Sequence, residues 1–220
     1  MNIIAIDGSS SAGKGTLALK LAETLDYAYL DTGALYRGVG FEMLEKNLNP
    51  EDEEQALKVA ESLTIDRMLS LQDDSRIRNE VCGKAASQVS ALPKVRKALF
   101  DFQRRFALNP IKKDKTPAKG AILDGRDIGT VICPEAPVKI FLTASSEIRA
   151  KRRYKELQLK GLCVIFEKVL EDITARDKRD SERATAPLRP AEDALVIDTS
   201  SMTADDVYAQ VIRYIDGRVK

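Results

Sequence analysis

Histidine is absent from the 220-residue chain, and only three residues are cysteine. Without histidine the chain has no Ser–His or Cys–His catalytic pair, and it lacks the commonest zinc ligand. Cys82, Cys133 and Cys163 are odd in number and far apart, which argues against a disulfide framework and a C-x-x-C metal motif. We expect three reduced, buried thiols in a protein of the cytoplasm.

An excess of charge of one sign is also missing, because 35 lysines and arginines nearly balance 34 aspartates and glutamates. Proteins that coat nucleic acids or bind membrane surfaces carry a large basic excess, so neither kind of partner is expected. No apolar run approaches the roughly 18 residues of a membrane span, and residues 1–7 contain an acid but no basic cluster. We expect a globular monomer without a signal peptide or a membrane segment.

Glycine is sparse as well, with 12 residues in the chain, yet three of them fall between Gly8 and Gly15. The apolar residues 3–6 precede this loop, and their short unbroken run is typical of a strand buried on both faces of a parallel sheet. Leucines at every fourth position then predict a helix over residues 14–25. The chain therefore begins with a strand, a glycine loop and a helix.

This layout is typical of a site for a phosphate chain. Glycines adopt strained backbone angles and let backbone N–H groups approach phosphate oxygens, while the start of the helix adds its positive dipole end and Lys14 a point charge. Residues 8–14 fit the G-x-x-x-x-G-K pattern, but the following hydroxyl comes one residue late, at Thr16. The alternative is a glycine-rich turn with an exposed lysine. The flanking strand and helix favour phosphate binding.

Short apolar runs elsewhere predict four further strands, at residues 27–30, 121–123, 138–142 and 195–197. Helical periodicity predicts helices at about 32–46, 54–63, 81–106, 163–183 and 204–215, and a further helix that starts at about 145. Thr32 is the expected N-cap of the first of these, and Pro93 is expected to break the third. Residues 65–71 fit a strand or a helix, 72–75 a hairpin turn, and the lysine-rich 109–120 an exposed loop. Five strands alternating with helices predict an α/β fold with a five-stranded, mostly parallel sheet and helices on both faces.

In such sheets ligands bind at the carboxyl ends of the strands. Asp31 and Arg37 follow the second predicted strand, and Arg126 and Asp127 follow the third. The sequence therefore predicts that these side chains and the glycine loop meet at one edge of the sheet.

Arg176, Asp180 and Arg183 have the spacing of residues on one helix face. On an isolated helix this spacing is typical of ion pairs on a solvated surface. Beside a phosphate loop, permanent cations also suit a second phosphorylated substrate and the charge of a transferring phosphoryl group. Transfer onto a phosphate acceptor needs no strong general base, which agrees with the absence of histidine.

Five segments together resemble the bacterial-type cytidylate kinases, which are P-loop nucleoside monophosphate kinases. They are IDGSSSAGKGT (6–16), LDTGALYR (30–37), AASQVSALPKVR (85–96), DGRDIGTVICPEAPVKIFLTAS (124–145) and RDKRDSERATAPL (176–188). The resemblance implies the nucleoside monophosphate kinase fold in a single kinase domain, with a core at 1–49 and 111–220. A monophosphate-binding insert at about 50–110 and a lid at about 150–162 would complete it.

The same resemblance implies the substrates ATP and CMP, dCMP as a second acceptor, and Mg²⁺ held near Thr16, mainly through phosphates and water. It places the ATP phosphates on Gly8, Ser9, Ser10, Ser11, Ala12, Gly13, Lys14, Gly15 and Thr16. It implies Thr32, Arg37, Arg126 and Arg183 for the acceptor phosphate, Ser87, Arg96 and Asp127 for the base, and Arg176 and Asp180 for the sugar hydroxyls. Lys14, Arg126, Arg183 and the lid residues Arg152 and Arg153 are implied as catalytic.

The base assignment also has a chemical reason. Cytosine offers an amino donor beside two acceptors, which an aspartate and an arginine complement, whereas uracil reverses the polarity at the two discriminating positions. A helix N-cap and a solvated arginine are the alternative interpretations of Ser87 and Arg96. Ser9 and Ser11 stand where the family usually has a proline and an extra glycine. Ser11 should be tolerated if its backbone angles are ordinary, so this departure bears on loop geometry and ATP affinity.

Two other functions remain open at this stage. The chain fits a kinase of another nucleoside monophosphate or a small hydroxyl compound, because the glycine loop does not identify the acceptor. It also fits a nucleotide-binding module without catalysis, although arginines in three separate segments favour an enzyme.

Overall fold

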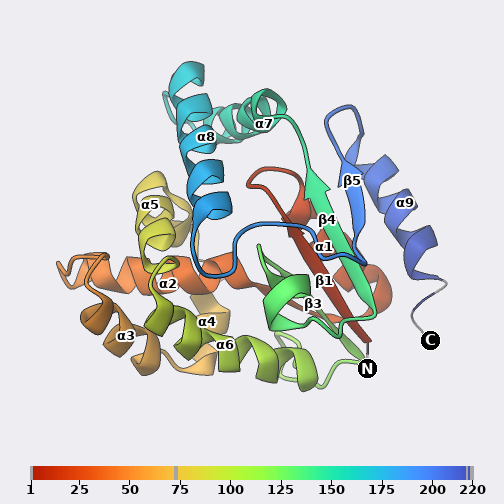
Figure 1. The fold of residues 1–220 in the computed structure, drawn as a ribbon, viewed down its shortest axis with the longest axis horizontal. Helices are drawn as coiled ribbons and strands as arrows, with labels where there is room; N and C mark the ends of the chain where they lie inside the picture. The colour runs from red at the N-terminus through yellow and green to blue at the C-terminus, as the bar shows by residue number, and fades with distance from the viewer. Residues whose placement is uncertain (1, 72–73, 217, 219–220) are drawn as a thin grey trace.

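The computed structural model describes residues 2–71, 74–216 and 218, and a five-stranded sheet forms its centre (Figure 1). The strands are β1 (Asn2–Gly8), β2 (Ala28–Asp31), β3 (Gly120–Asp124), β4 (Val138–Thr143) and β5 (Leu195–Asp198). They lie in the order β2-β3-β1-β4-β5, and every neighbouring pair is parallel. The predicted fold class is therefore confirmed.

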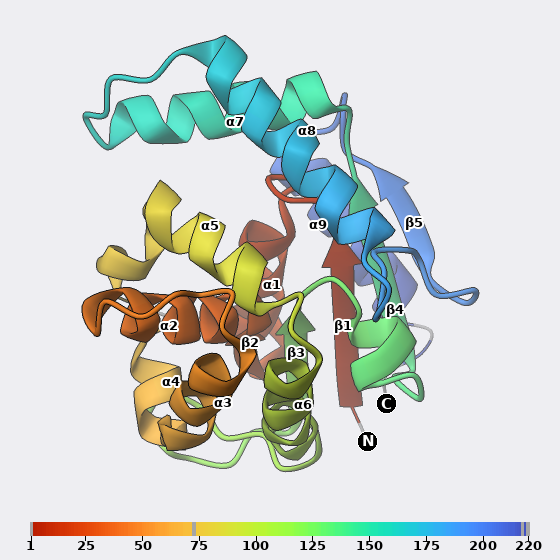
Figure 2. The same ribbon diagram turned by 60° about the vertical axis from the view of Figure 1, so that its left-hand side comes forward.

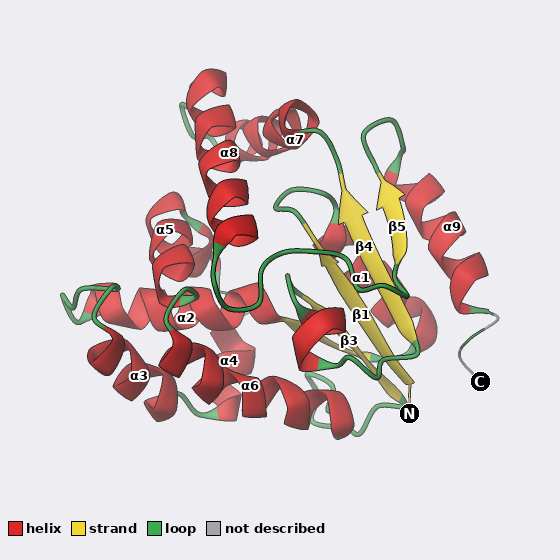
Figure 3. Ribbon diagram, in the orientation of Figure 1, coloured by secondary structure: helices red, strands yellow, loops and turns green. Residues whose placement is uncertain are grey.

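Helices cover both faces of this sheet (Figure 3). The α-helices are α1 (Lys14–Leu25), α2 (Thr32–Glu45), α3 (Glu53–Ser62), α4 (Ile65–Leu71), α5 (Glu80–Val89), α6 (Pro93–Leu108), α7 (Ser146–Leu159), α8 (Phe166–Glu182) and α9 (Ala204–Ile215). Two short turns complete the chain, the 3₁₀ turn η1 (Ser75–Arg78) and the π-helical turn η2 (Ile128–Ile132). None of the described helices is long and apolar enough to cross a membrane.

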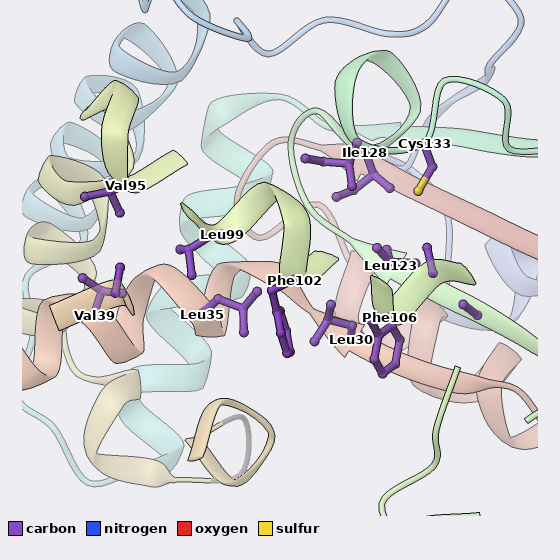
Figure 4. Close-up of a cluster of buried hydrophobic side chains, with 14 of the residues drawn as sticks. Leu30, Leu35, Val39, Val95, Leu99, Phe102, Phe106, Leu123, Ile128 and Cys133 are labelled. Atoms are coloured by element: carbon purple, nitrogen blue, oxygen red, sulfur yellow. The ribbon is translucent and has the colours of Figure 1, made fainter. Parts of the chain in front are cut away.

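The two hydrophobic layers follow from the alternation of residues along β1. Ile4 and Ile6 belong to a buried cluster with apolar residues of α1 and α9. Ile3 and Ala5 belong to a second cluster, with residues of α2, α3 and α6. Figure 4 shows part of this second cluster, where Leu35, Leu99 and Phe102 lie together. Because both faces are covered, β1 needs a continuous apolar run rather than an alternating one.

Segments outside the sheet form two helical groups. Residues 53–108 supply α3 to α6, with α3 against α6 and α5 against α2. The helices α7 and α8 pack against each other and extend beyond the carboxyl ends of the strands (Figures 1 and 2). Tyr154 and Phe166 make an edge-to-face ring contact between them, with ring centroids 5.9 Å apart.

Several predicted elements need correction. Asp31, not Thr32, caps α2, because the Asp31 carboxylate accepts a hydrogen bond from the Ala34 N–H. Residues 65–71 are helical, which settles the open choice. The predicted hairpin turn is wrong where it is described, because Asp74 caps η1 and no strand follows; Gln72 and Asp73 lie outside the described residues.

Two further predictions concern exposure. Cys82 and Cys133 are buried as expected, but Cys163 is exposed in the turn between α7 and α8, so the prediction of three buried thiols is wrong. The lysine-rich loop 109–120 is largely exposed as predicted, and a bridge between Ile111 and Pro117 closes it.

Candidate active site

The glycine loop joins β1 to α1 at the carboxyl end of the sheet (Figure 1). At Gly8, φ is +140°, and a Cβ there would lie 1.9 Å from the Leu142 carbonyl oxygen, so only glycine fits. At Gly13, φ is +99°, and this residue starts α1 without any side-chain cap. The first N–H groups of the helix therefore have no side-chain acceptor, which is the arrangement that binds anions.

Ser11 does not meet the condition of ordinary backbone angles under which a serine would be tolerated here. Its φ is +59°, in the left-handed region that favours glycine. Ser11 also lines the cavity beside the loop. The serine therefore keeps a strained conformation at a place where a phosphate group is expected.

Lys14 is buried with only 7% of its surface exposed, and its Nζ donates a hydrogen bond of 2.8 Å to the Ser9 carbonyl oxygen. The Asp124 carboxylate lies 4.0 Å from the same atom. Burial, followed by the positive charge of Arg126, lowers the pKa of Lys14 to about 7. A buried ammonium group with one distant carboxylate is suited to hold a more highly charged anion.

A cavity of about 450 Å³ opens beside the loop. Its lining combines hydroxyls, carboxylates and cations, namely Ser11, Gly13, Lys14, Gly15, Thr16, Leu19, Tyr29, Asp31, Arg78, Lys113, Asp124 and Glu156. Glu156 belongs to α7, so the cavity extends from the loop to the helix pair above it.

A group of arginines lies at the same edge of the sheet. The Arg126 Nε donates a hydrogen bond of 2.9 Å to Asp180, and Arg176 lies 3.9 Å from the same carboxylate. Burial, followed by the charge of Arg126, lowers the pKa of Arg176 to about 9. Arg126 and Arg176 also lower the pKa of Lys14, which places their charges near the glycine loop.

Two of these buried guanidinium groups carry unused N–H donors. Within residues 2–71, 74–216 and 218, the Arg176 Nε and the Arg183 Nη2 make no hydrogen bond. The nearest carboxylate oxygens lie 3.9 Å from the Arg176 Nε and 3.8 Å from the Arg183 Nη2, too far for hydrogen bonds, and burying such donors without a hydrogen bond is costly. The cost is explained if an anionic ligand supplies the acceptors.

The predicted base-binding residues form a separate buried ion-pair group. Arg96 donates a hydrogen bond to Asp127, and both side chains are about nine-tenths buried. Arg183 lies 3.8 Å from the other oxygen of Asp127. The Arg96 guanidinium lies 5.8 Å from the centre of the Tyr36 ring. The solvated-arginine interpretation of Arg96 is therefore wrong.

The remaining predicted residues occupy different positions. The Thr32 hydroxyl donates a hydrogen bond of 2.8 Å to the Asp124 carbonyl oxygen, and Arg37 donates one of 3.2 Å to that of Ile77. The Ser87 hydroxyl accepts a hydrogen bond of 3.1 Å from Arg179 on α8. This contact joins α5 to α8.

Arg183 does not share a helix face with Arg176 and Asp180, because α8 ends at Glu182. Arg183 has extended backbone angles, and its Nε donates to the Ala186 carbonyl oxygen. The departure of the chain from the helix turns this guanidinium toward Asp127.

The two predicted lid arginines already have protein partners. Arg152 donates hydrogen bonds to the hydroxyl and the carbonyl oxygen of Thr199 at 2.9 and 2.6 Å. The Thr199 hydroxyl in turn donates to the Ala12 carbonyl oxygen of the glycine loop. Arg153 pairs with Glu156 at 2.8 Å. Arg152 is thus connected to the glycine loop, and Arg153 lies beside a residue that lines the cavity.

Sequence reasoning missed three buried residues. Arg149 donates to the Ser10 carbonyl oxygen at 3.4 Å and pairs with Asp177, which links α7, α8 and the glycine loop. Asp124 ends β3 below Lys14, and burial raises its pKa to about 6 although Lys14 acts in the opposite direction. Asp7 on β1 accepts hydrogen bonds from the Ile128 and Gly129 N–H groups. The only sequence signal for Asp7 and Asp124 is an acid at the end of an apolar run.

Comparisons with known proteins agree with this geometry. The cytidylate kinase family model matches residues 4–217. The chain is 50% identical over 216 residues to a cytidylate kinase of Paramagnetospirillum magneticum, covering 98% of both chains. It is 53% identical over 207 residues to one of Rhodospirillum rubrum, covering 92% of both. A solved structure of an uncharacterized protein from Eubacterium ventriosum covers 99% of each chain with a TM-score of 0.53 and 16% identity, a likeness of fold alone.

Proposed function

The chain belongs to the cytidylate kinase family, and we propose that it transfers the γ-phosphoryl group of ATP to CMP, and also to dCMP, giving ADP and the diphosphate. The observation that carries this proposal is the pair of unused guanidinium donors, on Arg176 and Arg183, at the edge where the glycine loop lies. A module that bound only ATP would have no use for these buried cations. Transfer between two anionic substrates requires them.

The glycine loop holds the donor. Residues 8–16 offer backbone N–H groups, and Lys14 offers its ammonium group to the β and γ oxygens. ATP replaces the weak contact of Lys14 with Asp124 by stronger contacts with phosphate. The charge on the transferring group is then spread over fixed donors, so positioning and charge neutralisation supply most of the rate.

The arginines hold the acceptor. Arg37, Arg126 and Arg183, with the Thr32 hydroxyl, bind the phosphate of CMP. Arg176 and Asp180 bind the sugar hydroxyls. Asp180 is suited to this because Arg126 and Arg176 lower its pKa against the opposing effect of burial, so it stays a hydrogen-bond acceptor.

Asp127, Arg96 and Ser87 read the base. The Asp127 carboxylate accepts from the cytosine amino group, and Arg96 donates to its acceptors. Uracil would set its own oxygen against the buried Asp127 carboxylate, which places two hydrogen-bond acceptors opposite each other away from water. Selection of cytosine therefore results from the cost of a mismatch.

Mg²⁺ accompanies ATP in this proposal. The Thr16 hydroxyl and the Asp124 carboxylate give the cavity hard oxygen donors of the kind that binds Mg²⁺, so the residues fit the ion. When bound, the ion supplies charge neutralisation on the phosphates. The Thr16 hydroxyl lies on the first turn of α1 and is the residue best placed to hold it.

The two helical groups outside the sheet are the segments that move when substrates bind. Residues of about 50–110 form the monophosphate-binding insert and those of about 150–162 the lid, within a single kinase domain. Arg152 and Arg153 lie on α7, so closure of the lid brings their charges toward the transferring group and excludes water. The enzyme acts as a monomer in the cytoplasm, in pyrimidine nucleotide metabolism.

A substrate panel tests the function. The purified chain is assayed with ATP and Mg²⁺ against CMP, dCMP, UMP, AMP and shikimate, and product formation is followed directly. We expect CMP to give the highest kcat/KM. Turnover of another acceptor in preference to CMP would favour a different kinase, and no turnover with no thermal shift on adding CMP would favour a binding module.

A further inference from the structure

Asp7 is the one acidic residue of β1, and it has no role in the proposed reaction. Its side chain is only 4% exposed. Its Oδ1 accepts a hydrogen bond of 2.8 Å from the Ile128 N–H, and its Oδ2 accepts one of 2.7 Å from the Gly129 N–H. Both carboxylate oxygens are therefore used to hold the start of η2, more than 120 residues away in sequence.

The residues that precede η2 bind the acceptor in the proposed function. Arg126 and Asp127 stand immediately before Ile128, and η2 begins without a cap from the Asp127 side chain. The Arg126 and Asp127 side chains thus remain available for their contacts with Asp180 and Arg96. The Asp7 carboxylate takes the place of a local cap at this turn.

The packing around Gly129 makes this contact tight. A Cβ at Gly129 would lie 3.2 Å from the Lys139 Cδ and 3.4 Å from the Asp7 Oδ2. The turn therefore rests directly on side chains of β1 and β4, and an added side chain at Gly129 would require these neighbours to shift.

We infer that Asp7 is a positioning residue, which sets the place of Asp127 and Arg126 and thereby controls the affinity and base selectivity for the acceptor. Asp7 itself touches neither substrate. The glycine loop is less dependent on this side chain, because Gly8 is held in register with Leu142 by the sheet. The inference rests on the proposed function and adds a role for a residue outside the proposed contacts.

Asp7→Asn tests the inference with little change in volume. An asparagine offers one oxygen to the two N–H groups and opposes an NH₂ group to the other, so the turn loses one acceptor and gains a repulsion. We expect KM for CMP to rise about tenfold and the preference for CMP over UMP to fall by a similar factor, with KM for ATP within about twofold. The assays are run at pH 8, because burial raises the pKa of Asp7 to about 7.

Two further variants make the result interpretable. Gly129→Ala places a methyl group between the turn and its supports Asp7 and Lys139, so it displaces the same turn and its effects are expected in the same direction. The double variant is expected to show less than additive changes. Val211→Ala removes fully buried apolar contact from α9, on the far side of the sheet, and is the control for lowered stability alone. Calorimetry with CMP alone measures acceptor binding without turnover.

Separate outcomes overturn the inference and the proposed function. If wild-type protein phosphorylates CMP but Asp7→Asn and Gly129→Ala keep its KM and selectivity, Asp7 is not a positioning residue. An equal rise in KM for CMP in Val211→Ala would also reject it, because stability alone would then explain the effect. If the wild-type protein neither binds nor phosphorylates CMP, the proposed function itself fails.

Discussion

Replacing Ser11 by glycine tests whether the glycine loop of this chain stores strain. Ser11 has φ of +59°, and a side chain in this left-handed region costs about 1–2 kcal/mol. The same substitution gives the unfolded chain more freedom, which costs about 0.4–1 kcal/mol. We therefore expect Ser11→Gly to raise the free energy of unfolding by about 0.5–1 kcal/mol.

The measurement is thermal unfolding followed by circular dichroism. For a chain of 220 residues, an unfolding entropy of about 2 cal/mol/K per residue converts 1 kcal/mol into a shift of about 2 °C. The expected increase in Tm is thus about 1–2 °C. Ser11→Ala is the matched control, because alanine removes the hydroxyl but keeps the Cβ that causes the strain.

The two variants also separate strain from chemistry. Ser11 lines the cavity where the ATP phosphates are proposed to bind, so loss of its hydroxyl is expected to raise KM for ATP equally in both. Only Ser11→Gly is expected to gain stability. If Ser11→Ala is as stable as Ser11→Gly, the backbone at this position is not strained and the reasoning fails.

Three further predictions concern the proposed reaction. Lys14→Ala is expected to lower kcat by about 10²–10³ without lowering Tm, because the lysine is buried at a cost; turnover close to wild type would remove it from the mechanism. Asp127→Asn is expected to reduce the preference for CMP over UMP by about tenfold, and unchanged selectivity in a two-substrate assay would reject its role in base reading. Because burial and Arg126 lower the pKa of Lys14 to about 7, the free enzyme loses this charge as pH rises. The kcat/KM for ATP is then expected to fall about tenfold per pH unit above about 7, and a flat profile from pH 7 to 9 would contradict this.

The sequence predicts most of the fold because the strong patterns are local. The helices α1 and α9 have the predicted bounds, since a glycine loop and a Thr203 capping box fix their starts. The apolar runs of β1, β3 and β4 identify strands covered on both faces. The order of the strands was not predictable in this way, because it depends on contacts between residues far apart in the chain.

The errors have physical causes as well. Asp31 and Thr32 are both good caps, and the choice between them depends on Thr32 bonding the Asp124 carbonyl oxygen across the sheet. Helical spacing placed Arg183 on one face with Arg176, but α8 ends one residue before Arg183. The left-handed conformation of Ser11 has no signal in its neighbours along the chain, and only the glycine of the family pattern at this position points to it.

In the candidate site, too, residues marked by local sequence patterns were predictable, and contacts between distant parts of the chain were not. Lys14 and Arg126 follow strands, so their meeting at one edge was predictable from the rule for parallel sheets. Asp7 also lies at the end of a strand, but its partner Gly129 and the Asp177 partner of Arg149 come from other parts of the chain, so neither contact was predictable. These buried polar contacts hold the loops that carry the arginines. Burying polar groups lowers the stability of the fold, so such contacts are expected where exact geometry is needed for function. We therefore expect the accuracy of phosphoryl transfer in this protein to depend also on residues that touch no substrate.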